Sequence, residues 1–318
     1  MRILLVGRDA KFNAEFFYEK AFTEIGNDVF FVNSYRGINH QFLSRIVYTR
    51  TSAFNHFLRN LWINKFILDK VKDIDPDIII FFKGELITDQ ILKYLSENRN
   101  IYLFYPDTYK FKPLLRRELR YFKAVFTASN NKLFYHDMGA KRVETIPWAC
   151  DPDFHKELDI QKKYDVSFIG TAYLERRKII RKLHNVDVFG DFWYGFGKHV
   201  HSSVNGSDFI KTINESKINL NLQAKISVMA DAPTMRTFEI AGCGGFQISD
   251  YMPSLKKYFP MMPTFNTISE LRELIKYYLD NADERQDIAE KCKEICVRSF
   301  KYTDSAKIIF DVIHNNSL

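Results

Sequence analysis

Residues 217–250 have the sequence KINLNLQAKISVMADAPTMRTFEIAGCGGFQISD. This stretch carries the clearest structural signal in the chain. Its first residues form an apolar run that is typical of a buried strand. A loop, a short helical pattern with Arg236 and Glu239, the turn Gly244-Gly245 and a second apolar run follow. A strand, a helix and a returning strand in this order indicate a parallel sheet of the α/β class.

The same alternation of apolar runs and helical patterns extends over the whole chain. Strands are predicted at residues 2–7, 28–33, 77–82, 100–105, 123–128, 142–146, 164–170, 186–189, 217–222 and 245–248. Helices are predicted at 13–25, 53–71, 89–97, 131–138, near Glu175, and at 268–279, 284–298 and 303–314. We therefore predict two sequential Rossmann-like domains, each a doubly wound parallel sheet.

A segment with two prolines, residues 146–155, interrupts this alternation, and a charged stretch follows it. We interpret the segment as an interdomain linker. The predicted domains are residues 1–150 and 151–302, and a C-terminal helix in 303–318 is expected to pack back toward the first domain. Since ligands of open α/β sheets bind outside the carboxyl ends of the strands, we expect a central cleft between the two facing domains.

The net charge of +7 indicates either an anionic partner or a basic surface that is solvated. Basic and aromatic residues are interleaved in two segments, residues 41–72 and 110–123. Such segments suit a membrane surface or a phosphate-rich acceptor. The alternative is a set of helices with aromatic core faces and solvated basic faces. No nucleic-acid partner is expected.

The lengths of the apolar runs and the number of cysteines exclude further classes of protein. No run approaches the roughly 18 apolar residues of a membrane span, and the N-terminal run is too short for a signal peptide. A cytoplasmic protein is therefore expected, with peripheral membrane contact through residues 41–72 as an open alternative. The four cysteines are too few, and too poorly spaced, for a disulfide framework or a zinc site.

Residues 217–250 also hold the groups that a nucleoside diphosphate requires. A helix N-terminus and a glycine turn offer N–H groups, Arg236 neutralises phosphate charge, and Glu239 can accept hydrogen bonds from ribose hydroxyls. Two plainer interpretations stay open: Glu239 pairs with Arg236 at the surface, and Gly244-Gly245 only ends a helix. The occurrence of Arg236 and Glu239 together with Asn221 and the linker favours a nucleotide site.

The pattern Arg-x-Phe-Glu-x-Ala-x-x-Gly-Gly that begins at Arg236 resembles the donor-site signature of CgeB-like (spore maturation protein) GT-B glycosyltransferases. The linker from Ile146-Pro147 to Phe154 is similar to the crossing segment of retaining GT-B enzymes, with one residue fewer after Asp151. The resemblance covers roughly residues 120–314. It implies the GT-B architecture, with an acceptor-binding first domain and a nucleotide-sugar-binding second domain.

The resemblance also implies roles for single residues. Glu239 is the expected ribose ligand, and Asp231, eight positions earlier, replaces the glutamate that usually contacts the donor sugar. The other predicted donor-site residues are Gly170, Thr171, Arg176 or Arg177, Asn221, Arg236, Gly244 and Gly245. The implied donor is a UDP-sugar, with a GDP-sugar as the alternative, and no other cofactor is required. Retention of configuration is likewise an implication of the resemblance.

Acceptor-side candidates follow the strands of the first domain. Asp107 lies in the turn after an apolar strand, and we predict it to be an acid, a base or a positioning group. An Asx-type turn is the alternative. Further candidates at the ends of neighbouring strands are Lys83, Glu85, Arg8 and Asp9.

The Asp-x-Asp triplets Asp75-Pro76-Asp77 and Asp151-Pro152-Asp153 precede a strand and lie in the linker, respectively. These positions indicate turns, so no metal site is predicted. The loop with His199 and His201 is expected either to stack on a base or to be an ordinary surface loop.

Together these features predict a metal-independent glycosyltransferase of the hexosyltransferase class. It would transfer a sugar from the nucleotide-sugar to a hydroxyl of a glycan, a lipid-linked molecule or a protein. A sugar-nucleotide epimerase on the same fold is one alternative, but it requires a histidine constellation that is not evident. A non-catalytic binding or structural protein is the other alternative.

Overall fold

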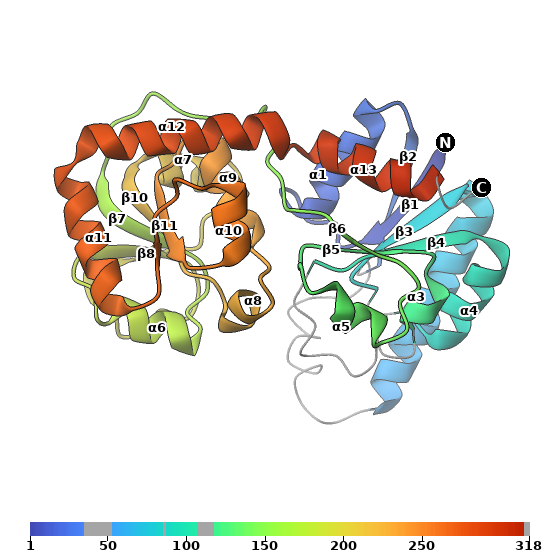
Figure 1. Cartoon of the computed structure of the whole chain (residues 1–318). Coiled ribbons are helices and arrows are strands. Elements are labelled where there is room, and N and C mark those ends of the chain that lie inside the picture. The colour runs from blue at the N-terminus through green and yellow to red at the C-terminus, as the bar shows by residue number, and fades with distance from the viewer. Residues whose placement is uncertain (35–52, 85–86, 107–117, 315–318) are drawn as a thin grey trace. The chain divides into compact units, whose positions relative to one another are not determined.

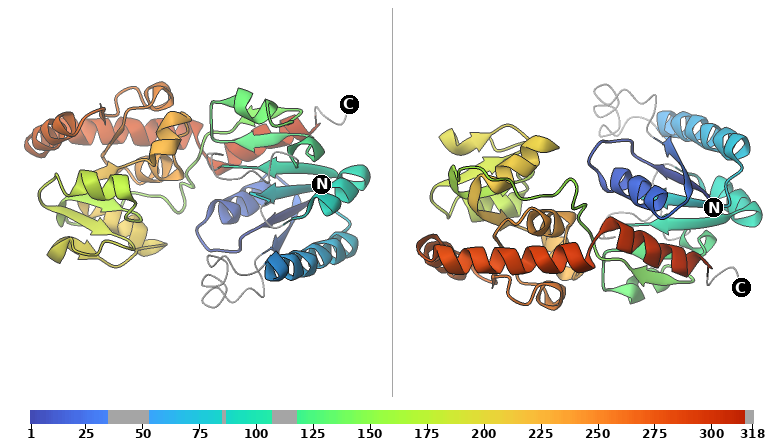
Figure 2. Two further views of the ribbon diagram at one scale, coloured as in Figure 1. Left: turned by 90° about the horizontal axis from the view of Figure 1, so that it is seen from below. Right: turned by 90° about the horizontal axis from the view of Figure 1, so that it is seen from above.

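The computed structural model describes residues 1–34, 53–84, 87–106 and 118–314, without the side chains of residues 53–61. The chain divides into two compact units. Unit 1 comprises Met1–Thr127, Asn131–Ile146 and Ala306–Leu318, and unit 2 comprises Ala128–Asn130 and Pro147–Ser305. Figures 1 and 2 show helices on both faces of each sheet, as in a doubly wound fold.

The described strands of unit 1 form one six-stranded parallel sheet in the order β2-β1-β3-β4-β5-β6. They are β1 (Arg2–Gly7), β2 (Asp28–Asn33), β3 (Ile78–Phe82), β4 (Asn100–Phe104), β5 (Val125–Thr127) and β6 (Val143–Thr145). Their helices are α1 (Ala14–Glu24), α3 (Ala53–Ile74), α4 (Asp89–Asn98), the 3₁₀-helix η3 (Leu119–Tyr121), α5 (Lys132–His136) and α13 (Tyr302–His314), whose first turn belongs to unit 2. All six strands predicted for the first half are confirmed.

Aromatic side chains fill the core of unit 1. The ring of Tyr18 on α1 lies 4.9 Å from that of Phe104 and 5.7 Å from that of Phe82. Phe22 is buried in the same layer. Strand β3, with the sequence IIIFF, is buried along its whole length. A strand that is covered on both faces is expected to be continuously apolar, and this is why the sequence identified it.

The described strands of unit 2 form a second six-stranded parallel sheet in the order β12-β11-β10-β7-β8-β9. They are β7 (Tyr164–Ile169), β8 (Val186–Phe189), β9 (Val200–His201), β10 (Ser216–Asn221), β11 (Gln247–Asp250) and β12 (Thr264–Phe265). The helices are α6 (Leu174–Ile180), η4 (Gly197–His199, 3₁₀), α7 (Ser207–Asn214), α8 (Lys225–Met229), α9 (Met235–Gly242), α10 (Pro253–Tyr258), α11 (Ile268–Asp280) and α12 (Ala282–Ser299). The four strands predicted here are confirmed, and β9 and β12 were missed.

The segment predicted to be a linker is tied to the end of α12. The backbone N–H of Cys150 donates to the carbonyl of Phe300 over 2.8 Å, and the N–H of Tyr302 donates to the carbonyl of Cys150 over 3.2 Å. Just beyond, the N–H of Asp153 donates to Oδ1 of Asp151 over 2.9 Å. This is the turn that the sequence predicted for the second Asp-x-Asp triplet.

All four cysteines are buried free thiols in unit 2, namely Cys150, Cys243, Cys292 and Cys296. Burial raises the pKa of Cys292 to about 12. Since the thiolate is the reactive form, Cys292 packs as a small apolar group at neutral pH.

Glu118, next to η3, makes the stability of unit 1 depend on pH. Burial, with the nearby charge of Asp89, raises its pKa from the ordinary 4.5 to about 7. Between these values the folded state binds more protons than the unfolded state, so stability falls as the pH rises from 4.5 to 7.

We expect Glu118→Gln to remove this loss. Allowing for solvent screening, the gain above pH 7 is about 1 kcal/mol, or roughly 2–4 °C in Tm. Thermal unfolding at about pH 8 and at about pH 4.5 checks this, because the gain is expected only at the higher pH. An equal shift at both pH values would contradict it.

Candidate functional site

The sheet of unit 2 has a topological switch point between β7 and β10. From β7 the chain proceeds to β8 and β9 on one side, and it returns to the other side of β7 to form β10, β11 and β12. Ligands of open α/β sheets bind at the carboxyl ends of the strands at such a reversal. Gly170 and Thr171 follow β7 at this point, and Leu222 and Gln223 follow β10.

Arg176 spans the switch point from helix α6. Its Nε donates to the carbonyl of Leu222 over 3.0 Å, and its Nη1 donates to the carbonyl of Thr171 over 3.2 Å. The guanidinium carbon lies 5.2 Å from the ring centroid of Phe168 and 5.1 Å from that of Tyr173. Aromatic faces and carbonyl oxygens therefore fix this cation, and no carboxylate of the described residues forms a direct ion pair with it.

Arg236 reaches the same point from the first turn of α9. Its Nη1 donates to the carbonyl of Ile169, and its guanidinium lies over the ring of Phe209. A Cβ atom on Gly170 would lie 3.1 Å from Nη1 of Arg236 and 3.3 Å from Nη1 of Arg176. The absence of a side chain at Gly170 thus allows the two guanidinium groups to converge beside the end of β7.

Burial disfavours the charge of both arginines. Burial and the positive charge of Arg236 lower the pKa of Arg176 to about 10, so Arg176 is still a cation at neutral pH. Burial also lowers the pKa of Arg236, and Glu239 offsets part of this effect. The Nε atom of Arg236 is buried and has no hydrogen-bond partner among the described residues. Such a pair of cations favours the binding of an anion.

Two carboxylates border this pair. Asp250 ends β11 and accepts a hydrogen bond from the N–H of Gln223 over 2.7 Å. Burial raises the pKa of Asp250, whereas that N–H and the charge of Arg176 lower it. Glu239 lies one turn after Arg236 on α9 and is only 5% exposed. A surface ion pair with Arg236, the plainer alternative, therefore does not describe Glu239.

Asn221 lies beneath the site rather than in it. Its Nδ2 donates to Oγ1 of Thr237 over 2.8 Å and to Oε1 of Gln247 over 2.9 Å. Nε2 of Gln223 also donates to Oγ1 of Thr237, over 3.3 Å. This buried network joins β10 and β11 to α9, so Asn221 helps to position the helix that carries Arg236.

Arg177 lies away from the arginine pair. Its Nη1 and Nη2 donate to the carbonyls of Phe192 and Tyr194 over 2.5 and 2.9 Å, and they hold the loop that follows β8. Of the two arginines that the sequence left open, Arg176 is the one at the switch point.

Gly244 and Gly245 lie at the opposite end of α9 from Arg236. Their N–H groups donate to the carbonyls of Ala241 and Ile240, both over 2.9 Å, and Gly244 has a φ of +67°. These are the bonds of a helix C-cap, as in the plainer interpretation of the sequence.

The carboxylate of Asp231 is engaged within unit 2. Its Oδ1 accepts hydrogen bonds from the N–H of Ser254 over 3.0 Å and from Oγ of Ser254 over 2.7 Å. Nδ2 of Asn130 lies 3.4 Å from Oδ2. Asp231 thereby caps the N-terminus of α10.

The acceptor-side candidates are only partly described. Asp107 and Glu85 lie outside the described residues. Arg8 and Lys83 follow β1 and β3, between which the chain reverses in unit 1. Their charges both act on Glu15, a residue that the sequence interpretation missed.

Glu15 lies in the first turn of α1 and is 9% exposed. Burial raises its pKa, while its own N–H, the N–H and charge of Arg8 and the charge of Lys83 lower it. A Cβ atom on Gly7 would lie 3.0 Å from Cγ of Glu15, so this carboxyl group lies against the end of β1. An acidic residue in the first turn of the first predicted helix was the available signal.

His199 and His201 are both bound to one carboxylate. Nε2 of His201 lies 2.7 Å and Nδ1 of His199 lies 3.4 Å from Oδ1 of Asp187. The ring of His201 also stacks on Phe189, with 4.4 Å between the centroids. These contacts fix the loop to β8.

Two features are absent from the part of the chain that the structure describes. No cluster of three or more His, Cys, Asp or Glu side chains suited to a metal ion occurs there. No helix there combines the length and the apolar character that crossing a membrane requires.

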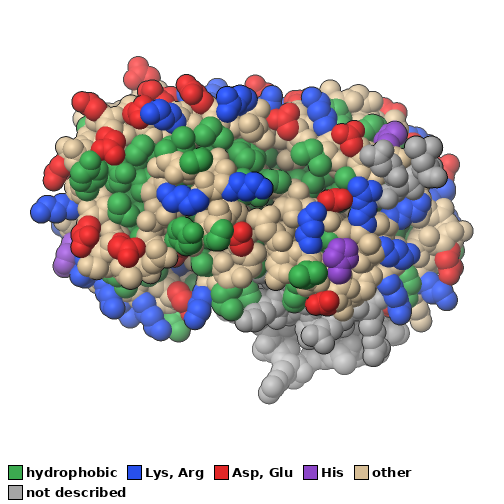
Figure 3. Space-filling model, in the orientation of Figure 1, with side chains coloured by type: hydrophobic (Ala, Val, Ile, Leu, Met, Phe, Trp, Pro, Cys, Tyr) green, Lys and Arg blue, Asp and Glu red, His purple; other side chains and the backbone are tan. Residues whose placement is uncertain are grey.

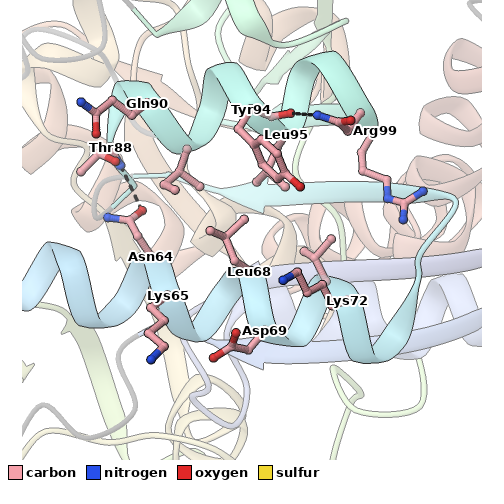
Figure 4. A pocket seen from close by; sticks show the side chains of 13 residues that line it. Asn64, Lys65, Leu68, Asp69, Lys72, Thr88, Gln90, Tyr94, Leu95 and Arg99 are labelled. Carbon is pink, nitrogen blue, oxygen red and sulfur yellow. Dashed lines mark hydrogen bonds between the residues drawn. The ribbon is translucent and has the colours of Figure 1, made fainter.

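A groove of about 570 Å³ lies between α3 and α4 of unit 1. Leu68 and Leu95 form part of its floor, and Figure 4 shows them between the two helices. Lys65 and Lys72 line its edge on α3, with Asp69 between them. The groove therefore combines an apolar floor with a mainly basic edge.

Comparison with known proteins agrees with this geometry. Residues 173–311, which include Arg176, Arg236 and Glu239, match the family described as Glycosyl transferase-like. The chain is 21% identical over 267 residues to the spore protein CgeB of Bacillus subtilis (strain 168), which covers 74% of this chain and 83% of that protein. The predicted resemblance to CgeB is confirmed.

Solved structures share the fold. Sucrose-phosphate synthase from Thermosynechococcus elongatus superposes with a TM-score of 0.70 at 9% identity, covering 99% of this chain and 98% of that one. HepE from Anabaena, in complex with UDP and glucose, gives a TM-score of 0.67 at 12% identity, covering 99% and 100%. The family match and the CgeB relative show that the chain resembles CgeB-like glycosyltransferases, and the solved structures show that its fold is the GT-B architecture.

Proposed function

We propose that unit 2 binds the nucleoside diphosphate of a sugar donor at its switch point, and that the enzyme transfers the sugar to an acceptor hydroxyl. The observation that carries this proposal is the convergence of Arg176 and Arg236 beside Gly170. Related structures hold UDP and UDP-glucose, so a UDP-sugar is the proposed donor, with a GDP-sugar as the alternative.

In the proposed reaction the arginine pair stabilises the departing diphosphate. The acceptor oxygen forms a bond to the anomeric carbon, and the bond from that carbon to the diphosphate oxygen breaks. Two fixed guanidinium groups supply positive charge where negative charge develops, so a metal-independent reaction is proposed. Glu239 accepts hydrogen bonds from the ribose hydroxyls. Retention of configuration is proposed from the resemblance to retaining GT-B enzymes.

For the acceptor we propose the first domain, residues 1–150. Glu15 is a buried carboxyl group at the end of β1 on which the charges of Arg8 and Lys83 act, and it is a candidate to receive or position the hydroxyl proton. Asp107 and Glu85 remain candidates for the same role.

The test is a thermal-shift panel with UDP, GDP, ADP, CMP and dTDP, with and without Mg²⁺, on the wild type and Glu239→Ala. A ligand at about 100 times its Kd stabilises the fold by about 2.7 kcal/mol. We expect one nucleotide, UDP, to stabilise the wild type without Mg²⁺ and the variant to respond far less. No response to any nucleotide would contradict the proposed function and favour the binding-protein alternative.

We further propose that the α3–α4 groove contacts anionic lipid, as a peripheral membrane surface or a lipid-linked acceptor. Lys65 and Lys72 line the groove, and Trp62, three residues before Lys65 on α3, is half-exposed. On the face drawn in Figure 3, basic and acidic side chains are interspersed. A local combination of lysines, an exposed aromatic and an apolar floor therefore supports this proposal better than the net charge does.

The prediction is that Lys65→Glu/Lys72→Glu weakens binding to phosphatidylglycerol vesicles by at least about tenfold, since each lysine contributes about 1 kcal/mol. Vesicle sedimentation at low salt measures it, with phosphatidylcholine vesicles as the neutral reference. Lys70→Glu is the matched control, because Lys70 pairs with Asp73 on the same helix and does not line the groove. Equal sedimentation of all three proteins, or binding to neutral vesicles alone, would refute the proposal.

A further inference from the structure

His155 ends a tight turn that begins at Asp151. Its N–H donates to the carbonyl of Asp151 over 2.6 Å, and the N–H of Asp151 donates to Nδ1 of His155 over 2.9 Å. The His155 side chain is 1% exposed and meets the ring of Phe154 edge-on at 5.1 Å. The turn therefore fixes both the position and the orientation of the imidazole.

These bonds also select the tautomer. Because Nδ1 accepts a hydrogen bond from the backbone, the neutral imidazole carries its proton on Nε2. Nε2 lies 3.6 Å from Oε1 of Glu239, and both side chains are buried. This distance is longer than a direct hydrogen bond, but polar contacts at binding sites commonly tighten only when the ligand is present.

Close packing of α9 against the turn holds the two residues at this separation. A Cβ atom on Gly242 would lie 2.8 Å from Cβ of Cys150 and 3.2 Å from Cβ of His155. Glu239 lies three residues before Gly242 and thus on the same side of the helix. Only a glycine permits this approach of helix and turn.

We propose that His155 is a positioning residue that orients the carboxylate of Glu239 toward the ribose hydroxyls of the donor. The inference rests on the proposed function, in which Glu239 is the ribose ligand. Nε2–H holds one carboxylate oxygen and leaves the other to accept from the ribose. It also keeps the carboxylate from turning to Arg236, whose charge Glu239 already influences, so that Arg236 stays available for the diphosphate.

Two substitutions separate positioning from folding. His155→Asn keeps an acceptor near Nδ1 for the Asp151 N–H and removes the donor toward Glu239. His155→Gln places an amide donor near Nε2 and loses the backbone acceptor. The readout on the full chain is the ratio of the Kd values for 2′-deoxy-UDP and UDP, measured by calorimetry together with Tm.

We expect the wild type and His155→Gln to prefer UDP by about tenfold, the effect of one charge-assisted hydrogen bond. For His155→Asn the ratio is expected to fall toward one without a matching loss of Tm. In Glu239→Gln, the further change His155→Asn is expected to leave the ratio unaltered, because the imidazole acts through the carboxylate.

Opposite results overturn the inference in distinguishable ways. If His155→Asn retains the wild-type ratio, or if both His155 variants lose Tm and keep the ratio, the residue serves the fold alone. If His155→Asn does not fold, loss of the ratio in the folded His155→Gln variant refutes positioning. A wild type that binds UDP and 2′-deoxy-UDP equally refutes the ribose role of Glu239. A wild type that binds no UDP instead refutes the proposed function.

Discussion

Arg236→Met is expected to weaken UDP binding by about tenfold to a hundredfold. The same substitution is expected to raise the Tm of the ligand-free protein. The loss reflects charged hydrogen bonds to the diphosphate, each worth about 1.5–3 kcal/mol. The gain arises because the variant removes a buried cation that lowers the pKa of Arg176 and whose own Nε lacks a partner among the described residues. About 1 kcal/mol would raise Tm by roughly 2–4 °C. Thermal unfolding without ligand and calorimetry with UDP measure the two effects.

Arg177→Met is the matched control on α6, the helix that carries Arg176. It removes the bonds to the carbonyls of Phe192 and Tyr194, so Tm is expected to fall while UDP affinity changes by less than about threefold. A protein in which Arg236→Met lowers Tm and binds UDP normally would show that Arg236 serves the fold.

Gly242→Ala is expected to destabilise unit 2 by about 2 kcal/mol, or roughly 4–8 °C in Tm. At a helical position where the added methyl group meets open space, replacing glycine by alanine stabilises a protein by about 1 kcal/mol. A loss of stability in Gly242→Ala would therefore in itself indicate a clash. The added Cβ would lie 2.8 Å from Cβ of Cys150, an atom held by the backbone pairing of residues 150 and 301. Thermal or denaturant unfolding measures the change.

A second substitution tests the cause. Cys150→Gly removes the clashing atom, so the double variant is expected to be more stable than the sum of the two single effects predicts. Strict additivity would mean that the loss arises elsewhere.

The sequence predicted the central strands well because strands such as β3 and β4 are buried on both faces and therefore continuously apolar, as in the IIIFF of β3. It missed β9 and β12 because two-residue strands carry no periodicity. It also missed α7 and α10, which span eight and six residues. Short elements of this kind depend on tertiary packing more than on local propensity.

The candidate site was harder to predict because its geometry depends on residues distant in the sequence. Arg176 and Arg177 are neighbours in the chain, yet helix geometry directs one to the switch point and the other to the loop after β8. The partner of Asp231 is Ser254, 23 residues later. His155 lies 3.6 Å from Glu239, although the two residues are far apart in the sequence. No local pattern encodes such contacts.

Hydrogen exchange of the full chain with and without saturating UDP tests most directly whether the donor binds at the switch point of unit 2. We predict slower exchange in peptides that cover residues 169–176 and 222–238, and unchanged exchange in those that cover residues 62–72 of the α3–α4 groove. Protection confined to unit 1, or none under conditions where UDP raises Tm, would contradict the assignment of the donor to the Arg176–Arg236 pair.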